Sequence, residues 1–289
     1  MSQASLFLCY NGRVLKDHEF VASHRNRAFK YGDGFFETMH FAYGHVQLLE
    51  QHFERIRRAM DDLQMFNNVL LQPKLIENEI KHLISANHFF NGARVRLTVF
   101  REDGGLYRPA GNKANYLIEV ASLDALNYPL NSEGLHIDLY LKHSKSTGIN
   151  YFYKSLNSKV SILGSILASE LMVDDCLLIN SKGELIESTN SNLFIIKDLN
   201  VYTPAIESGC VDGIMRGEVI KIIKNSNLNL HTYSFFTPKD IISFDEIFLT
   251  NAIKGIQWVG AYHQKRYDNK ITKQLHSQLV KTIMPESFK

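Results

Sequence analysis

A single lysine, Lys154, follows three aromatic residues in the stretch NYFYKSLNSKV. An ammonium group held among the rings of Tyr151, Phe152 and Tyr153 would lose part of its hydration, which lowers its pKa and makes the neutral amine available as a nucleophile. A lysine whose stem passes the rings and whose ammonium reaches water gives the same sequence. The stretch alone is therefore consistent with a reactive amine and with an ordinary surface lysine.

A carboxylate, Glu187, ends the strand-like segment ELIE and precedes the polar loop STNSN, 33 residues after Lys154. A carboxylate at a strand end beside a loop often lines a cleft, but a residue in that place also often faces water. Glu187 is a candidate site residue on this pattern, with a solvated side chain as the alternative.

Two segments could bind an anion through backbone N–H groups. In VDGIMRGEVI, Gly213 stands at the start of a predicted helix, where free N–H groups and the helix dipole favour a phosphate. In LTNAIKG, a strand runs into a turn at Asn251 and Ala252. An ordinary helix start and an ordinary turn give the same patterns. Neither segment is a P-loop, and YGDGFFET is not a dinucleotide-binding motif, so ATP and NAD have no support.

Arg55 lies beside Ile56, at the edge of the apolar face of a predicted helix. From that edge a guanidinium can bind a phosphate through two donors. The alternative is a surface pair with Glu54 or Asp61.

Arg101 continues the apolar face of the strand-like segment VRLTVFR, where a charge must find an anion or leave the sheet. With Tyr107 and Arg108 in the following loop, it forms a possible carboxylate-binding corner. A salt-bridged residue at the sheet edge is the alternative, and the sequence favours neither.

These candidates together supply an amine, a carboxylate and several phosphate-binding N–H groups. This set suits pyridoxal 5′-phosphate (PLP), whose aldehyde reacts with an amine, whose ring nitrogen is kept protonated by a carboxylate, and whose phosphate needs N–H donors.

The composition excludes several classes of protein. The 32 basic and 30 acidic residues give a net charge of +2, which argues against nucleic-acid or membrane binding through a basic surface. Cys9, Cys176 and Cys210 are too few and too scattered for a disulfide framework or a zinc site, and no metal is expected. The start MSQASLFLCYNGR has no charged leader, and no apolar run approaches the roughly 20 residues that span a bilayer. We expect a soluble cytoplasmic protein.

The elements that must position these residues are both strands and helices. FFETMHFAYGHVQLL predicts two strands joined at Tyr43-Gly44. Apolar residues from Leu49 to Leu63 recur at spacings of 4, 3, 4 and 3, which is typical of an amphipathic helix. A second helix is expected after Pro73, followed by the strands ARVRLTVFR and NYLIEVAS.

The polar, proline-containing stretch LDALNYPLNSEG marks the expected domain boundary. It predicts a smaller N-terminal domain of residues 1–123, a linker of residues 124–134 and a larger C-terminal domain of residues 135–289 that carries Lys154. In the second domain we expect a strand over Leu135–Leu141 and a helix over Val160–Met172, with Ile162, Leu163, Ile166 and Leu167 on its apolar side. The hairpin CLLINSKGELIE, the strands SNLFII and DEIFLTNAIKG, and the helices VDGIMRGEVIKIIKN and ITKQLHSQLVKTIM follow. The fold class is mixed α and β, in two lobes.

The motifs, taken in order, resemble the class IV, D-amino-acid-aminotransferase-like PLP enzymes (fold type IV). The resemblance rests on YGDGFFET, EQHFERI, RLTVFREDGGLYRP, KSLN, GELIESTNSNLF, DGIMRG and FLTNAIKGI, which cover about residues 31–259. It implies a small N-terminal α/β domain, a larger C-terminal domain with a β-barrel-like core, and a homodimer with the site at the domain junction.

The resemblance also implies a role for each candidate. Lys154 would bond to the cofactor and carry protons, Glu187 would pair with the pyridine nitrogen, and Arg55 would hold the phosphate with the backbone at Gly213, Ile214, Met215, Asn251 and Ala252. Thr38 joins Lys154 as a catalytic candidate, and Tyr31, Arg101, Tyr107 and Arg108 would face a small-molecule amino substrate.

Within this family, TNAIKGIQWV and REDGGLYRP are more similar to 4-amino-4-deoxychorismate lyase, an enzyme of folate precursor synthesis. KSLN is shared with D-amino-acid aminotransferases, and Glu37 before Thr38 departs from the lyase pattern. Branched-chain enzymes typically have Gly-Thr-Ala-Ala where this chain has TNAI, and a tyrosine where it has Lys159. The resemblance favours the lyase and keeps a branched-chain or D-amino-acid aminotransferase as the alternative. A binding protein without catalysis is disfavoured because Lys154 and Glu187 are both present.

Overall fold

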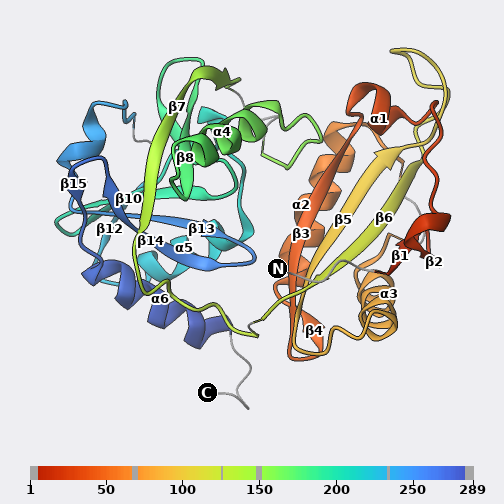
Figure 1. The fold of residues 1–289 in the computed structure, drawn as a ribbon, viewed down its shortest axis with the longest axis horizontal. Coiled ribbons are helices and arrows are strands. Elements are labelled where there is room, and N and C mark those ends of the chain that lie inside the picture. The colour runs from red at the N-terminus through yellow and green to blue at the C-terminus, as the bar shows by residue number, and fades with distance from the viewer. Residues whose placement is uncertain (1–5, 67–70, 125, 148–151, 233–234, 284–289) are drawn as a thin grey trace. The chain divides into compact units, whose positions relative to one another are not determined.

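The computed structural model describes residues 6–66, 71–124, 126–147, 152–232 and 235–283, and it divides into two compact units (Figure 1). Unit 1 comprises Met1–Asn127 and Tyr153–Asn157, and unit 2 comprises Tyr128–Phe152 and Ser158–Lys289. The sequence assigns Lys154 to the C-terminal domain, whereas in the structure the short segment that contains this lysine packs with unit 1.

Unit 1 is built on an antiparallel sheet whose described strands have the order β2-β1-β6-β5-β3-β4. The strands are β1 (Phe7–Tyr10), β2 (Arg13–Lys16), β3 (Gly34–Ala42), β4 (His45–Val46), β5 (Ala93–Arg101) and β6 (Ala114–Ser122). The predicted turn between β3 and β4 is confirmed, because Ala42 pairs with His45 across Tyr43 and Gly44. Both turn residues have a positive φ (55° and 80°), as a two-residue hairpin turn requires.

Two helices cover one face of this sheet, and both are where the periodicity predicts them. α2 (Leu49–Asp62) and α3 (Pro73–Ala86) share a core with residues such as Phe35 and Met39 of β3 and Val95 of β5. Because side chains alternate along a strand, Phe36, Thr38 and Arg96 lie on the opposite face of the sheet. The short helix α1 (Arg27–Tyr31) leads into β3, and a 3-10 turn (Asp17–Glu19) follows β2.

Unit 2 contains the barrel-like core that the resemblance implies. Its sheet has the order β12-β11-β10-β13-β14-β7-β8-β9, and an additional β9–β10 pairing closes β9, β10, β13, β14, β7 and β8 into a ring. The described strands are β7 (Leu135–Lys145), β8 (Asp175–Asn180), β9 (Leu185–Ser188), β10 (Asn192–Lys197), β11 (Asn200–Tyr202), β12 (Asn229–His231), β13 (Glu246–Asn251), β14 (Gly255–Tyr262) and β15 (Lys265–Arg266).

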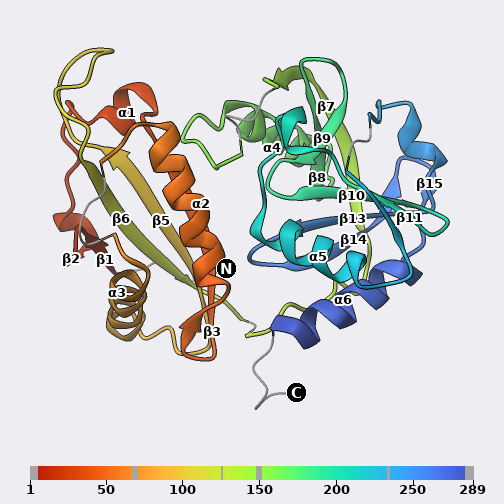
Figure 2. The ribbon, with the colours of Figure 1, turned by 180° about the vertical axis from the view of Figure 1, so that it is seen from behind.

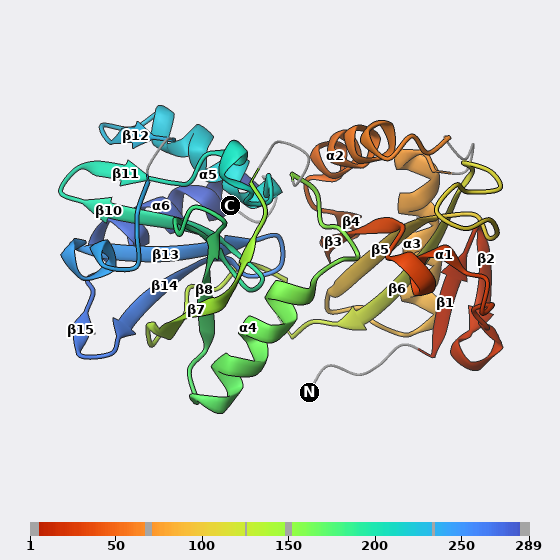
Figure 3. The same cartoon turned by 90° about the horizontal axis from the view of Figure 1, so that it is seen from above.

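The helices of unit 2 are α4 (Lys159–Glu170), α5 (Ile214–Lys224) and α6 (Lys270–Ile283), with 3-10 turns at Ile206–Ser208 and Asp240–Ser243. Figure 2 shows α5 and α6 side by side, and both helices contact β13. Figure 3 shows α4 alongside β7 and β8, which are the strands that it contacts. No helix in the described ranges is both long and apolar enough to cross a membrane.

The helix α4 forms where expected, but the prediction of its apolar side is wrong in part. Ile162 and Ile166 are 57% and 49% exposed, whereas Gly164 and Ala168 are the buried positions of the helix. A Cβ atom on Gly164 would lie 3.0 Å from side-chain atoms of Leu178 and Thr189, so small residues let the helix approach β8 closely. Hydrophobicity alone does not reveal a packing face made of small residues.

Candidate active site

Lys154 lies on a short segment that runs against the start of β3 in unit 1. The backbone N–H of Phe36 donates to the carbonyl of Lys154 (2.9 Å), and the N–H of Leu156 donates to the carbonyl of Gly34 (3.1 Å). The Nζ atom of Lys154 lies 5.6 Å from the centroid of the Phe36 ring, and the residue is half-buried. The chain therefore holds this amine beside an aromatic ring by backbone hydrogen bonds.

The aromatic residues before Lys154 also anchor the backbone. The ring of Tyr153 packs edge-on against Phe35 with 5.9 Å between centroids, and Phe152 is buried. Tyr151, which the sequence places in the same cluster, lies outside the described residues.

Beside this segment, unit 1 contains a buried network of Glu37, His52 and Arg55. These three side chains are 0%, 1% and 3% exposed. The guanidinium of Arg55 donates from Nε and Nη2 to the two oxygens of Glu37, at 2.7 Å each, and Nδ1 of His52 lies 2.7 Å from Oε2 of the same carboxylate. Arg55 thus has a partner that neither sequence interpretation included.

The charges in this network are fixed by their mutual contacts. Burial alone would raise the pKa of Glu37, but the charge of Arg55 and the hydrogen bond from His52 lower it to about 2. The pKa of His52 is lowered, chiefly by burial, and the charges of Arg55 and Lys154 lower it further. An ionised carboxylate only accepts hydrogen bonds, so Nδ1 of His52 carries a proton, and the lowered pKa favours the neutral form of the ring. The network as a whole is therefore uncharged, and Lys154 lies within electrostatic reach of it.

Across the sheet from Thr38 stands Arg96, which the sequence analysis did not select. Thr38 of β3 is directly opposite Arg96 of β5, so the two side chains share one face. The Cζ atom of Arg96 lies 3.8 Å from the centroid of the Phe36 ring, the same ring that Lys154 approaches. Burial lowers the pKa of Arg96, and its ion pair with Glu119 spans 3.9 Å. Nε of Arg96 also donates to Oγ1 of Thr98 at 3.3 Å, and the side chain is 29% exposed, so a partly buried cation lies on this face beside Lys154.

Arg101 is 7% exposed and is surrounded by internal acceptors. It donates to Asp33 (2.9 Å) and Asn112 (2.7 Å) and to the carbonyls of Leu63 (2.7 Å) and Gln64 (3.4 Å). Of its two interpretations, this geometry matches the salt-bridged residue at the sheet edge, and we leave Arg101 out of the site proposed below.

The other residues of the predicted substrate corner lie on the surface of unit 1. The rings of Tyr31 and Tyr107 are 5.7 Å apart, and Tyr107 is 90% exposed. Arg108 is also exposed. Arg27, which the sequence analysis did not select, lies 4.9 Å above the ring of Tyr31.

In unit 2, Glu187 belongs to a row of polar side chains across three strands. Glu187 of β9 is directly opposite Asn192 of β10, which is directly opposite Thr250 of β13. Opposite residues of antiparallel strands point to the same face, so these three side chains form one polar row. They are 5%, 6% and 1% exposed, and Oγ1 of Thr250 has no hydrogen-bond partner among the described residues.

The Glu187 carboxylate is held by two donors. The Lys145 ammonium binds Oε1, and the backbone N–H of Val211 donates to Oε2 at 2.9 Å. Cys210 lies nearby, where burial raises the pKa of its thiol to about 11 and the charge of Glu187 adds to that rise. Cys210 therefore stays protonated at neutral pH.

The start of α5 meets the same row through Asn192. Gly213 is the N-cap residue of α5, and because a glycine has no side chain it does not cap the first N–H groups of the helix, which include those of Ile214 and Met215. The Asn192 amide donates to the carbonyl of Val211 at 2.7 Å, and a Cβ atom on Gly213 would collide with Oδ1 of Asn192. A glycine at position 213 thus allows the helix start to approach the polar row.

The turn after β13 is shaped by Asn251. Its Oδ1 accepts from the N–H groups of Ile253 (3.0 Å) and Lys254 (2.8 Å), and its amide donates to Oγ of Ser191 (2.9 Å). Asn251, the residue before Ala252, is therefore tied to the loop that connects Glu187 to Asn192. The structure brings together the predicted residues of unit 2 around one end of the barrel strands β9, β10 and β13.

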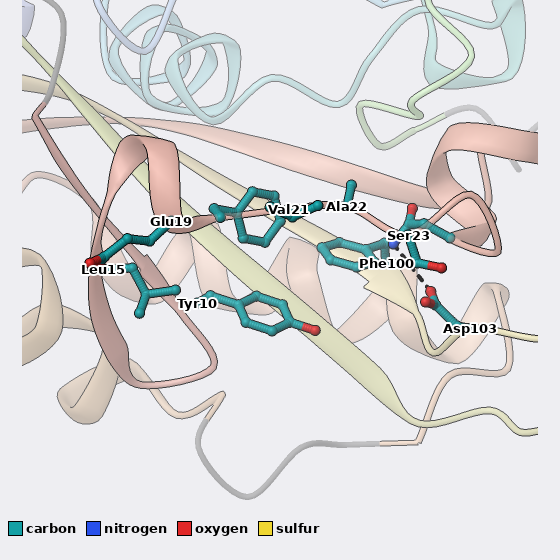
Figure 4. Close-up of a pocket in the computed structure, with 10 residues that line it drawn as sticks. Tyr10, Leu15, Glu19, Val21, Ala22, Ser23, Phe100 and Asp103 are labelled. Carbon is teal, nitrogen blue, oxygen red and sulfur yellow. Dashed lines mark hydrogen bonds between the residues drawn. The ribbon is translucent and has the colours of Figure 1, made fainter.

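A separate pocket of about 280 Å³ lies in unit 1, and Figure 4 shows it. Tyr10, Phe20 and Phe100 supply its aromatic wall, and Asn26 donates to Asp103 at 3.3 Å. Lys154 and the other predicted site residues are not among its lining residues.

Residues 34–262 match the family model of the class IV aminotransferases, and this match decides the family. This chain belongs to that family. It is 28% identical to the aminodeoxychorismate lyase of Bacillus subtilis, over 85% of this chain and 83% of that protein. It is also 28% identical to a putative branched-chain-amino-acid aminotransferase of Methanocaldococcus jannaschii, over 92% of each. The fold is similar to the PLP form of the branched-chain aminotransferase from Thermobaculum terrenum, with a TM-score of 0.81, 18% identity and coverage of 97% and 94%.

As a class IV aminotransferase-family member, the chain is an enzyme, and unit 2 offers features that fit a phosphorylated pyridine. The polar row supplies a buried carboxylate and, in Thr250, a buried hydroxyl without a partner among the described residues. The start of α5, whose N-cap residue is a glycine, supplies N–H donors of the kind that phosphates bind. The carboxylate suits a protonated ring nitrogen, and the N–H donors suit a phosphate. A ligand that carries both groups therefore matches these features.

Proposed function

We propose that this class IV enzyme is a 4-amino-4-deoxychorismate lyase that forms p-aminobenzoate and pyruvate. The observation that carries the proposal is the position of Arg96. Its guanidinium and the amine of Lys154 both lie close to the ring of Phe36. The lyase substrate carries two carboxylates in addition to its amino group, whereas a branched-chain amino acid carries one carboxylate and an apolar side chain. A partly buried cation near the site lysine suits the more acidic substrate, because a guanidinium binds carboxylates through charged hydrogen bonds.

The cofactor is PLP, in agreement with the family match and with the PLP form of a solved relative. When bound, it supplies an electron sink for bond cleavage next to the substrate amine. We propose that Glu187 pairs with its ring nitrogen. The N–H groups of Ile214, Met215 and Ala252 would hold its phosphate, whereas Arg55, which binds both oxygens of Glu37 in unit 1, is left out of this set.

In this proposal the chain's own residues bind the substrate and move protons. Arg96 holds a substrate carboxylate, and the hydroxyl of Thr38 on the same face offers a hydrogen bond to it. The amine of Lys154 removes a proton from the substrate ring and returns a proton to the departing three-carbon fragment. The carbon–oxygen bond to that fragment breaks, the ring becomes aromatic and pyruvate leaves. Atoms and electrons balance without a second substrate.

The first test is a product assay on purified, PLP-loaded protein given 4-amino-4-deoxychorismate and no keto acid. Equal amounts of p-aminobenzoate and pyruvate are expected. If no p-aminobenzoate forms above background, the lyase assignment is wrong. The enzyme would then be tested as an aminotransferase, which the relative from M. jannaschii suggests, by screening branched-chain and D-amino acids with keto acids.

A second test addresses Arg96. Arg96→Gln should raise KM for the substrate by roughly tenfold, the usual effect of losing one charged hydrogen bond. Arg94→Gln is the matched control, because Arg94 lies two residues away on the same strand and is exposed. Equal kinetics for both variants would remove Arg96 from the substrate site.

On the resemblance alone, we further propose that the chain forms homodimers in the cytoplasm and supplies folate precursor synthesis. Sedimentation of the purified protein, cell fractionation and rescue of p-aminobenzoate auxotrophy would test these three points.

A further inference from the structure

Lys145 reaches Glu187 from two strands away. The order β7-β8-β9 puts β8 between them, with Lys145 opposite Asn180 and Glu187 opposite Leu178. The backbones of β7 and β9 are therefore about 10 Å apart, and two long side chains must cross β8 to meet. The side chains of Lys145 and Glu187 are 19% and 6% exposed, so this pair is largely shielded from water.

We propose that Lys145 shares the Glu187 carboxylate with the cofactor and thereby limits how strongly this carboxylate holds the ring nitrogen. The inference deepens the proposed function, because it rests on Glu187 as the partner of that nitrogen. Lys145 acts in this proposal as a positioning residue through Glu187.

The carboxylate has room for all its partners. An ionised carboxyl group offers about four lone-pair directions, and the described donors to Glu187 are the Lys145 ammonium and the Val211 N–H. A third donor, such as a protonated ring nitrogen, can therefore bind without displacing Lys145.

Electrostatics sets the direction of the effect. A cation next to a carboxylate neutralises it, so a second cation at the same carboxylate gains less than it would at an unpaired one. Glu187 paired with Lys145 therefore stabilises the protonated ring nitrogen less than Glu187 without that partner would. This arrangement would weaken the electron demand of the ring, which suits a reaction already driven by aromatisation.

The experiment compares the binding of PLP with that of 1-deazapyridoxal 5′-phosphate, in which a C–H group replaces the ring nitrogen. The Kd of each is measured on the cofactor-free protein by titration. The ratio of the deaza Kd to the PLP Kd isolates the nitrogen–carboxylate interaction, because the phosphate and the aldehyde are common to both probes. General effects of a substitution on folding cancel in this ratio.

In Lys145→Met the ratio of the deaza Kd to the PLP Kd should rise roughly tenfold above wild type. A nearby opposite charge changes a pKa by about 1 to 3 units, and tenfold corresponds to the smallest of these changes. Lys145→Gln should behave like Lys145→Met, and Lys145→Arg, which keeps the charge, should stay within about twofold of wild type. In Glu187→Gln the ratio should fall toward one.

The outcomes separate the two levels of the argument. An unchanged or lower ratio in both neutral Lys145 variants, with a fall in Glu187→Gln, would overturn the role of Lys145 and keep that of Glu187. An unchanged ratio in Glu187→Gln would overturn the proposed pairing of Glu187 with the ring nitrogen, and the inference about Lys145 with it.

Discussion

Replacing Glu37 by Gln should destabilise the enzyme by about 3 kcal/mol at neutral pH. Glu37 is fully buried, and its contacts with Arg55 and His52 lower its pKa from 4.5 to about 2. Each pH unit between these values corresponds to about 1.4 kcal/mol, so the ionised form is stabilised by about 3 kcal/mol on folding. Removing one partner of a buried ion pair costs a similar amount, about 3 to 5 kcal/mol, because Arg55 keeps its charge without a counter-ion.

The pH dependence follows from the direction of this pKa change. The pKa of Glu37 is lower in the folded state, so its contribution is fully present above pH 4.5 and is lost as pH falls toward 2. The free energy of unfolding of wild type and of Glu37→Gln should therefore differ by about 3 kcal/mol at pH 7 and converge as pH falls below 4.5.

The assay is equilibrium urea unfolding followed by far-UV circular dichroism from pH 7 to pH 3. Glu54→Gln is the matched control, since Glu54 is exposed and lies on α2, the helix that carries His52 and Arg55. Its free energy of unfolding should stay within about 0.5 kcal/mol of wild type. A Glu37→Gln variant that loses less than about 1 kcal/mol at pH 7, or whose loss does not change with pH, would refute the reasoning.

Three further variants test other parts of the site. Lys154→Ala should abolish turnover and the yellow colour of PLP-loaded protein, and a yellow variant would rule out Lys154 as the residue bonded to the cofactor. Arg101→Ala should lower the free energy of unfolding by about 3 kcal/mol with little change in KM, and a higher KM at unchanged stability would restore its substrate role. Gly213→Ala should weaken PLP binding because the new methyl group displaces Asn192. The penalty should shrink in an Asn192→Ala background, and equal penalties in both backgrounds would exclude that collision as the cause.

The sequence predicts the elements that carry a strong hydrophobic period. The helix α2 forms where the 3.6-residue period of apolar residues places it, and β5 has Val95, Leu97 and Val99 buried on one face, as alternation requires. The motif order also predicts the family and the barrel-like core. These features are local or follow from a match over most of the chain, so they do not depend on knowing which strands pair.

The contacts between strands could not be predicted from the sequence. Arg96 faces Thr38 because of the register of β3 with β5, and Lys145 meets Glu187 because β7 and β9 flank β8. Spacing along the chain carries no information about either relationship. The packing side of α4 differs from the predicted one for another reason. Gly164 lets the helix approach β8 closely because it has no side chain, and a pattern of hydrophobic residues does not identify such a position.

Two buried carboxylates in this chain illustrate how structure separates a supporting residue from a binding residue. Glu37 accepts from two nitrogens of Arg55 and from His52, so its charge is balanced entirely within unit 1. Glu187 accepts from Lys145 and one backbone N–H, and it stands in a row with Thr250, whose buried hydroxyl has no partner among the described residues. Both are glutamates on strands, and both are almost fully buried. The unused hydrogen-bonding capacity around Glu187 is what points to a ligand, because a buried polar group without a partner is costly unless something binds there.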